Sequence, residues 1–216
     1  MPISEVYNCD CLEFMRSLPD KHFDLCIADP PYGINAGKMT MGSGNHKFVK
    51  GKDWDRRIPS DELFEEIFRV SENQIIWGGN YFKLPLCKDW IIWDKLNPNL
   101  SFAEAELAWC SINRNIRIFK YLTTKLDKGG KIHPTQKPIA LYSWLLDNYT
   151  SGGGKIFDPF LGSGSSRIAA YKKGFDFYAC ELDKDFYNAQ EERFRSECLG
   201  ESRQKDGTIL TQQKLF

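Results

Sequence analysis

Short apolar runs alternate with helical patterns along this chain, and this alternation constrains the fold more than any other feature. The runs have the length of buried strands: FDLCIAD (23–29), NQIIWGGN (73–80), DWIIWDK (89–95), KIFDPF (155–160) and FDFYACE (175–181). Helices are predicted over 60–71, 138–150, 164–174 and 183–197. Strands that alternate with helices predict an α/β fold, in which helices cover both faces of a mostly parallel sheet.

Two further apolar runs, AELAWCSI (105–112) and NIRIFKYL (115–122), flank Asn113 and Arg114. They predict an antiparallel pair of strands joined at that point. We expect a single domain over 1–198, with a small insert at about 110–132 and a basic loop at about 33–57. Residues 199–216 are predicted to form a C-terminal tail.

Length and composition are those of one globular domain, with 216 residues of which 42% are hydrophobic and 27% charged. The sequence has no run of about 18 apolar residues and no N-terminal pattern of a secretory signal. The seven cysteines form no CxxC pair, and the three histidines have no zinc-finger spacing. We therefore expect reduced, buried thiols, no metal site and a cytoplasmic protein.

The formal net charge is zero, but basic residues are concentrated in two islands. Residues 36–57 hold six Lys and Arg against two acids, and 110–137 hold seven against one. Residues 58–109 between them hold four basic residues against nine acids. If both islands lie on one face, that face attracts a polyanion. The alternative is that both are solvated loops.

A glycine-rich turn lies within FDPFLGSGSSRIAA (157–170). Gly162 and Gly164 separate a predicted strand from a predicted helix, where close approach of a nucleotide to the backbone needs glycine. Glu181 ends the next strand and is placed to accept both ribose hydroxyls of a nucleoside. Because the turn has GxG without a third glycine or a phosphate-binding lysine, a nucleoside such as S-adenosylmethionine fits better than NAD. Asp158 and the helix N-terminus would face its methionine end; the alternative is a turn without a ligand.

The run DLCIADPPYGI (24–34) ends a buried strand with an acid and two prolines. The prolines fix their own φ angles, so the Asp29 carboxylate and the Pro30 carbonyl are held at a set separation. Two rigid acceptors suit an exocyclic NH2 group, which becomes more nucleophilic when both hydrogens are bound. Pro31 completes the rigid turn, and Tyr32 offers an aromatic face to a flipped base. The alternative is a proline-rich turn with no catalytic role.

This arrangement resembles the DNA amino-methyltransferases of the permuted beta class, and the resemblance covers about residues 5–198. DPPY (29–32) precedes the cofactor turn DPFLGSG (158–164), and HPTQKP (133–138) lies between them. NCDCLEFMRSLPD (8–20), IIWGGNYF (75–82) and WIIWDK (90–95) are similar to intermediate motifs of the family. The resemblance implies a Rossmann-like S-adenosylmethionine-dependent methyltransferase fold and methyl transfer to a ring amino nitrogen.

Site residues carry over by matching motif position. The catalytic clamp is then Asp29, Pro30, Pro31 and Tyr32. The resemblance implies that the cofactor is bound by Asp10 (adenine), Asp29, Thr135 and Lys137 (carboxylate), Asp158, Phe160, Gly162, Gly164, Ser165 and Glu181 (ribose).

The chemistry does not separate adenine N6 from cytosine N4, because both are conjugated exocyclic amines. DPPY goes mostly with adenine in the family, so we favour adenine and keep cytosine as the second hypothesis. Three further hypotheses are an RNA methyltransferase, a protein-glutamine methyltransferase and a DNA-binding protein without catalysis. Glutamine enzymes usually carry Asn in the first clamp position, and the loss of catalysis predicts damage at Asp29, Tyr32 or the glycines, which are intact.

The expected partner is double-stranded DNA, and family members are often homodimers. We predict DNA contacts at basic residues of the two islands, namely Lys47, Lys50, Lys52, Arg114, Arg117, Lys120 and Lys125. The last five residues, QQKLF (212–216), match the Q-x-x-L-F peptide that bacterial replication proteins dock into the sliding clamp. The alternative for this segment is a tail that packs locally.

Overall fold

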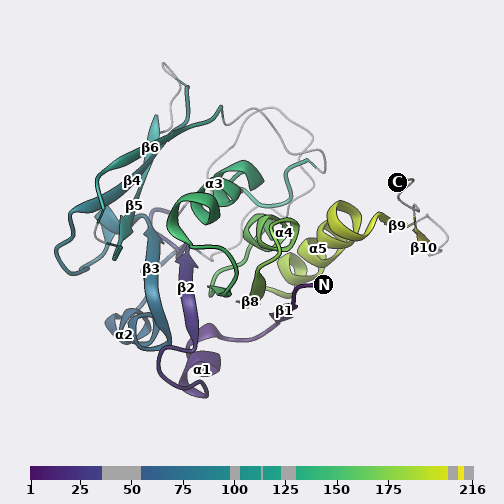
Figure 1. Cartoon of the computed structure of the whole chain (residues 1–216), viewed down its shortest axis with the longest axis horizontal. Coiled ribbons are helices and arrows are strands. Elements are labelled where there is room, and N and C mark those ends of the chain that lie inside the picture. The colour runs from purple at the N-terminus through teal and green to yellow at the C-terminus, as the bar shows by residue number, and fades with distance from the viewer. Residues whose placement is uncertain (36–54, 98–102, 113, 123–129, 204–208, 212–216) are drawn as a thin grey trace.

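The computed structural model describes residues 1–35, 55–97, 103–112, 114–122, 130–203 and 209–211 (Figure 1). Its strands are β1 (Ser4–Tyr7), β2 (Phe23–Ala28), β3 (Ser71–Trp77), β4 (Asp89–Asp94), β5 (Ala105–Cys110), β6 (Arg117–Lys120), β7 (Lys155–Asp158), β8 (Asp176–Cys180), β9 (Glu201–Arg203) and β10 (Ile209–Thr211). Its α-helices are α1 (Cys11–Arg16), α2 (Asp61–Val70), α3 (Ile139–Tyr149), α4 (Ser165–Lys172) and α5 (Lys184–Phe194). The predicted alternation of strands and helices is therefore confirmed.

Eight strands form one sheet in the order β1-β8-β7-β2-β3-β5-β4-β6. β5 pairs antiparallel with both β3 and β4, and every other pair in this sheet is parallel. β4 and β6 therefore run in the same direction as β2 and β3. The carboxyl ends of the seven parallel strands share one edge of the sheet, and β5 begins at that edge.

Helices cover both faces of the sheet, as predicted (Figure 1). Successive residues of β2 point to opposite faces, which is the strand period of two. Leu25 and Ile27 belong to a core that includes residues of α3 and α4. Cys26 and Ala28 belong to a second core that includes residues of α1 and α2. A strand buried on both faces has no room for polar alternation, which explains the continuous apolar runs in the sequence.

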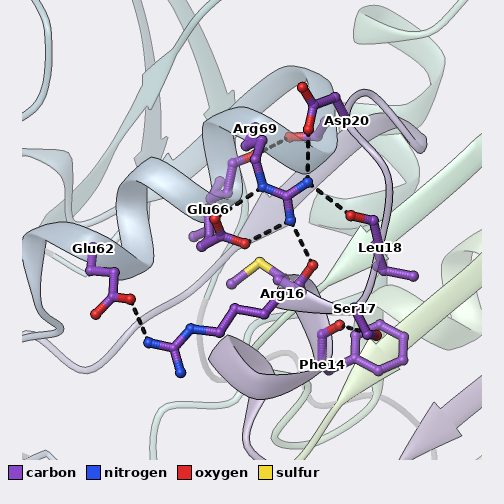
Figure 2. A network of polar contacts seen from close by, with 11 residues as sticks. Phe14, Arg16, Ser17, Leu18, Asp20, Glu62, Glu66 and Arg69 are labelled. Atoms are coloured by element: carbon purple, nitrogen blue, oxygen red, sulfur yellow. Dashed lines mark hydrogen bonds and ion pairs between the residues drawn. The ribbon is translucent and has the colours of Figure 1, made fainter.

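Helices α1 and α2 are joined by a polar network around Arg69, which Figure 2 shows. The Arg69 guanidinium donates to the Glu66 and Asp20 carboxylates at 2.7 and 2.8 Å. It also donates to the backbone carbonyls of Leu18 and Met15, each at 2.8 Å. These carbonyls lie at and just after the end of α1, where helix carbonyls lack partners within the helix. Arg69 thus fixes the segment between α1 and β2. The strand β2 in turn leads to Asp29.

The predicted antiparallel pair at 105–122 is wrong. β6 pairs parallel with β4, from Ile91 opposite Arg117 to Asp94 opposite Lys120. The reason is that β5 lies between β3 and β4, so both of its edges are already hydrogen-bonded. The short connection around Arg114 therefore carries the chain past β4 instead of folding back on β5.

The sequence patterns did not predict β1 or α1, since a four-residue strand and a six-residue helix carry little periodicity. The single-domain boundary at residue 198 remains a prediction. Among the described residues, no helix has both the length and the apolar character needed to cross a bilayer. All seven cysteines are free thiols, of which five are buried as predicted, whereas Cys9 and Cys87 are only half-buried.

Candidate active site

Acidic side chains from separate strands gather at the edge where the parallel strands end. Asp29 follows β2, Asp158 ends β7 and Glu181 follows β8. Glu106 joins them from the start of β5, because that strand runs the other way. Ligands of open parallel sheets bind outside this edge, so the fold itself places these residues in a binding position.

Asp29 is held in one orientation by two donors. The Tyr32 hydroxyl donates to Asp29 Oδ1 at 2.8 Å. The Lys137 ammonium lies 2.5 Å from the same oxygen. Pro30 and Pro31 link Asp29 to Tyr32 and keep this segment rigid. The structure therefore brings the predicted clamp residues together and adds a lysine to them.

Lys137, predicted to hold the cofactor carboxylate, contacts two protein carboxylates in this structure. Its ammonium bridges Asp29 and Glu106, with 3.0 Å to Glu106 Oε2, and its side chain is only 2% exposed. Glu106 Oε1 in turn lies 2.6 Å from the Lys95 ammonium. Lys137 thus contacts Asp29 of the predicted clamp, and its predicted contact with the cofactor carboxylate remains a prediction.

The charges of this cluster shift the pKa values of Asp29, Glu106 and Lys137. Burial raises the pKa of Asp29, and of the two nearest charges Lys137 lowers it while Glu106 raises it, for a net rise. Burial also raises the pKa of Glu106, but Lys137 and Lys95 outweigh burial and bring it to about 2. Burial opposes the charge of Lys137, but the two carboxylates outweigh it and raise its pKa. Glu106 and Lys137 are therefore ionised at neutral pH.

Tyr32 occupies a space that only glycine leaves open. Gly78 has φ +68°, and a Cβ atom there would lie 2.3 Å from the Tyr32 ring. Tyr32 also stacks on the ring of Tyr81, with ring centroids 5.1 Å apart. The sequence motif IIWGGNYF therefore holds a glycine and an aromatic ring that fix Tyr32.

The glycine-rich turn is closed by the acid of the next strand. Gly162 has φ +53°, and its amide donates to Glu181 Oε2 at 2.8 Å. The other oxygen of Glu181 accepts from the Asp183 amide at 2.8 Å. Gly164 has φ +74° and begins α4, whose first residue Ser165 is buried. The structure thus brings Glu181, the predicted ribose acceptor, to the glycine-rich turn.

Asp158 is buried below this turn and keeps its proton to an unusually high pH. Its Oδ1 accepts from the Phe160 amide at 2.9 Å, and its Oδ2 accepts from the Ser166 hydroxyl at 2.5 Å. Burial raises the pKa of Asp158 to about 7, although both hydrogen bonds lower it. The hydrogen bond from the Phe160 amide to Asp158 thereby fixes Phe160 beside the glycine-rich turn.

Asp158→Asn is expected to remove part of the pH dependence of the free energy of unfolding. The folded pKa of Asp158 is about 7. The unfolded value is about 3.9. The folded state therefore binds more protons between these values, so Asp158 destabilises the fold as the pH rises through this window. Urea unfolding from pH 4.5 to 7.5 measures this loss. An equal loss in Asp158→Asn and in the exposed-residue control Glu72→Gln would contradict the assignment.

Two further residues predicted to bind the cofactor lie in local turns. Asp10 caps α1, where its Oδ1 accepts from the Leu12 amide at 2.7 Å. Thr135 Oγ1 lies 3.2 Å from His133 Nδ1. Burial, with Lys137 and Lys131, lowers the pKa of His133 to about 3, so this ring is neutral. Contacts of Asp10 and Thr135 with a cofactor remain predictions.

The predicted DNA contacts do not share one edge of the sheet. Lys120 ends β6 beside Asp94, at the edge that holds the catalytic clamp. Arg114 and Arg117 lie before and at the start of β6, at the opposite edge, where they line a groove with Lys88 and Asn115. The contacts of Arg114, Arg117 and Lys120 with DNA remain predictions. Lys47, Lys50, Lys52, Lys125 and the tail 212–216 lie outside the described residues.

Comparisons with known proteins agree with this geometry. Residues 92–192 match the model of a family described as DNA methylase, of the N6/N4 methyltransferase type. The type II methyltransferase M2.DpnII from Streptococcus pneumoniae is 25% identical over 88% of this chain and 89% of its own length.

Two solved structures share the fold. M1.HpyAVI in complex with SAM has a TM-score of 0.58 and 19% identity, over 88% of this chain and 98% of its own. The PvuII DNA methyltransferase, described as cytosine-N4-specific, has a TM-score of 0.60 and 15% identity, over 90% and 87%. The Rossmann-like methyltransferase fold and the resemblance to the DNA amino-methyltransferases are thus confirmed.

Proposed function

We propose that this protein transfers a methyl group from S-adenosylmethionine to adenine N6 of a base flipped out of double-stranded DNA. The observation that carries the proposal is the position of the DPPY segment. Asp29 and the glycine-rich turn lie at the same edge of the sheet, although 133 residues separate Asp29 from Gly162. A methyl donor on the turn and an amine on the catalytic clamp would therefore meet.

The cofactor assignment fits the donor set of this edge. Gly162 and Gly164 have positive φ angles, so the turn presents backbone without side chains. Glu181 supplies a carboxylate to ribose hydroxyls. No phosphate-binding lysine follows the glycines. M1.HpyAVI, whose solved structure is a SAM complex, supports the same cofactor.

The clamp residues act on the target amine. The bound cofactor supplies an electrophilic methyl group on a sulfonium. The Asp29 carboxylate and the Pro30 carbonyl accept the two amine hydrogens, which frees the nitrogen lone pair from the ring. The amine nitrogen becomes positive as its bond to carbon forms, and Asp29 stabilises this charge and accepts the proton that leaves. Tyr32 and Lys137 hold Asp29 in place during this step.

Adenine is favoured by Asp29, because DPPY in this family goes mostly with adenine. Cytosine N4 is the second candidate, and the shared fold with the cytosine-N4-specific PvuII enzyme supports keeping it. Lys120, at the clamp edge, is the described residue that we assign to DNA phosphate. A homodimer, a cytoplasmic location and sliding-clamp binding through 212–216 remain proposals.

Expression in a host without DNA methylation, followed by sequencing for modified bases, tests the proposal. N6-methyladenine at one recurrent sequence is the expected result. N4-methylcytosine would transfer the proposal to the second candidate. Unmodified DNA together with methyl incorporation into structured RNA would favour an RNA enzyme, and no transfer to either would favour a DNA-binding protein without catalysis.

Glu181→Gln is expected to weaken S-adenosylmethionine binding by about 10- to 100-fold, since one charge-assisted hydrogen bond contributes about 1.5–3 kcal/mol. The glutamine side chain still has one acceptor oxygen, so it can keep the hydrogen bond from the Gly162 amide. Calorimetric titration measures the change. Glu72→Gln is the control because it neutralises an exposed carboxylate in β3. Equal affinity in both variants would remove Glu181 from the cofactor site.

A further inference from the structure

A row of alternating charges runs behind the catalytic clamp, in the order Lys95, Glu106, Lys137 and Asp29. We propose that Glu106 is a positioning residue for methyl transfer, which shares Lys137 with Asp29 and so keeps the net charge beside the target amine from becoming positive. This inference rests on the proposed function and adds a residue that the sequence patterns did not indicate.

The contacts of Lys137 carry the first step. Its ammonium lies 2.5 Å from Asp29 Oδ1 and 3.0 Å from Glu106 Oε2. Its side chain is 2% exposed, and those of Asp29 and Glu106 are 18% and 21% exposed, so water screens these charges only weakly. An ammonium paired with Asp29 alone would cancel the charge that the clamp needs. Glu106 draws part of that interaction to itself.

The charge balance carries the second step. The row holds two carboxylates and two ammonium groups, whose charges cancel. The Lys95 ammonium contacts Glu106 at 2.6 Å, at the end of the row away from Asp29. Removing the charge of Glu106 would leave two ammonium groups against Asp29. A net positive charge would then lie beside an amine that becomes positive during the reaction.

The topology carries the third step. β5 alone in its sheet runs antiparallel to its neighbours, and it starts at the edge where the parallel strands end. Glu106, the second residue of β5, therefore reaches the clamp. A purely structural ion pair with Lys95 would not need the second contact to Lys137.

Asp29 has several titratable neighbours besides Glu106, and they fix the expected direction of a pH effect. Lys137 lowers the pKa of Asp29, as does the hydrogen bond from Tyr32, whereas Glu106 raises it. Asp29 also interacts with two buried groups, Asp158 and Tyr142. All these groups remain in a Glu106→Gln variant, which loses only the negative charge of Glu106. Because that charge raises the pKa of Asp29, the pKa is expected to fall.

Glu106→Gln is compared with Glu191→Gln in a single-turnover methyl-transfer assay at saturating DNA and cofactor. Glu191 is a matched control because its carboxylate pairs with a buried arginine, Arg167, at 2.6 Å, and lies outside the site. We expect Glu106→Gln to lower the rate about tenfold or more, with cofactor affinity within about threefold. The acid limb of its rate profile is expected to move to lower pH. A rate equal to that of the control, or an acid limb moved to higher pH, would overturn the proposal.

Carbon-13 NMR of the Asp29 carboxyl group tests the same network without methyl transfer. The pKa of Asp29 is expected to fall in Glu106→Gln and to rise in Lys95→Gln, because the second variant leaves Glu106 without its other cation. Each variant has its own expected direction of the Asp29 pKa shift, so one variant still tests the inference if the other fails to fold. An unchanged pKa in the folded variants would overturn the inference, whereas an inactive wild-type protein with these shifts would overturn only the proposed function.

Discussion

Asp29→Ala is expected to lower the rate of methyl transfer by at least about 100-fold, which corresponds to about 2.7 kcal/mol of transition-state stabilisation. The variant removes the carboxylate that accepts an amine hydrogen and the proton. Single-turnover incorporation of labelled methyl into duplex DNA measures the rate. Binding of S-adenosylmethionine is expected to persist, because the glycine turn and Glu181 are unchanged.

The folding of this variant is protected by the remaining contacts. Lys137 keeps Glu106 at 3.0 Å after Asp29 is truncated, so no isolated buried charge results. Thermal unfolding and cofactor titration serve as controls for the loss of rate. Transfer that stays within about tenfold of wild type, near 1.4 kcal/mol, would show that the clamp is misassigned.

Gly78→Ala is expected to cost about 2–5 kcal/mol of unfolding free energy and to lower the transfer rate at least about tenfold. Two effects combine here. The φ angle of +68° disfavours any residue with a Cβ, and that Cβ would lie 2.3 Å from the Tyr32 ring. Tyr32 can yield only by losing its 2.8 Å hydrogen bond to Asp29. Urea unfolding and the single-turnover assay measure the two losses.

Gly153→Ala separates backbone strain from displacement of Tyr32. Gly153 has φ +72°, but a Cβ there would meet nothing within 4 Å. This control is expected to lose only the backbone part, about 1–2 kcal/mol, with an unchanged transfer rate. Equal losses in the two variants would mean that Gly78 serves the turn and not the clamp.

The strand pattern predicted most of the sheet because its strands are buried on both faces. FDLCIAD and KIFDPF carry continuous apolar runs, and both became central strands. The pairing of β6 could not be predicted in the same way. Turn residues such as Asn113 and Arg114 favour a hairpin locally, but the decision depends on whether β5 has a free edge, which is a property of the whole sheet.

The candidate site was predictable where a motif lies within one segment. DPPY fixes the clamp by its own backbone, and the GxG turn meets Glu181 at the expected strand end. Glu106 gave no such signal, because its partners Lys95 and Lys137 lie 11 and 31 residues away along the chain. Charge counts likewise placed Arg117 and Lys120 in one basic island, although these residues lie at opposite ends of β6.

A crystal structure with a bound S-adenosylmethionine analogue and a DNA duplex tests the central claim most directly. We predict that the extruded adenine places N6 at hydrogen-bond distance from Asp29, with the methyl-bearing sulfur in line behind it. The nitrogen and the methyl carbon should then be about 3–3.5 Å apart. A sulfonium bound on another side of the molecule, away from Asp29 and Glu181, would contradict this claim.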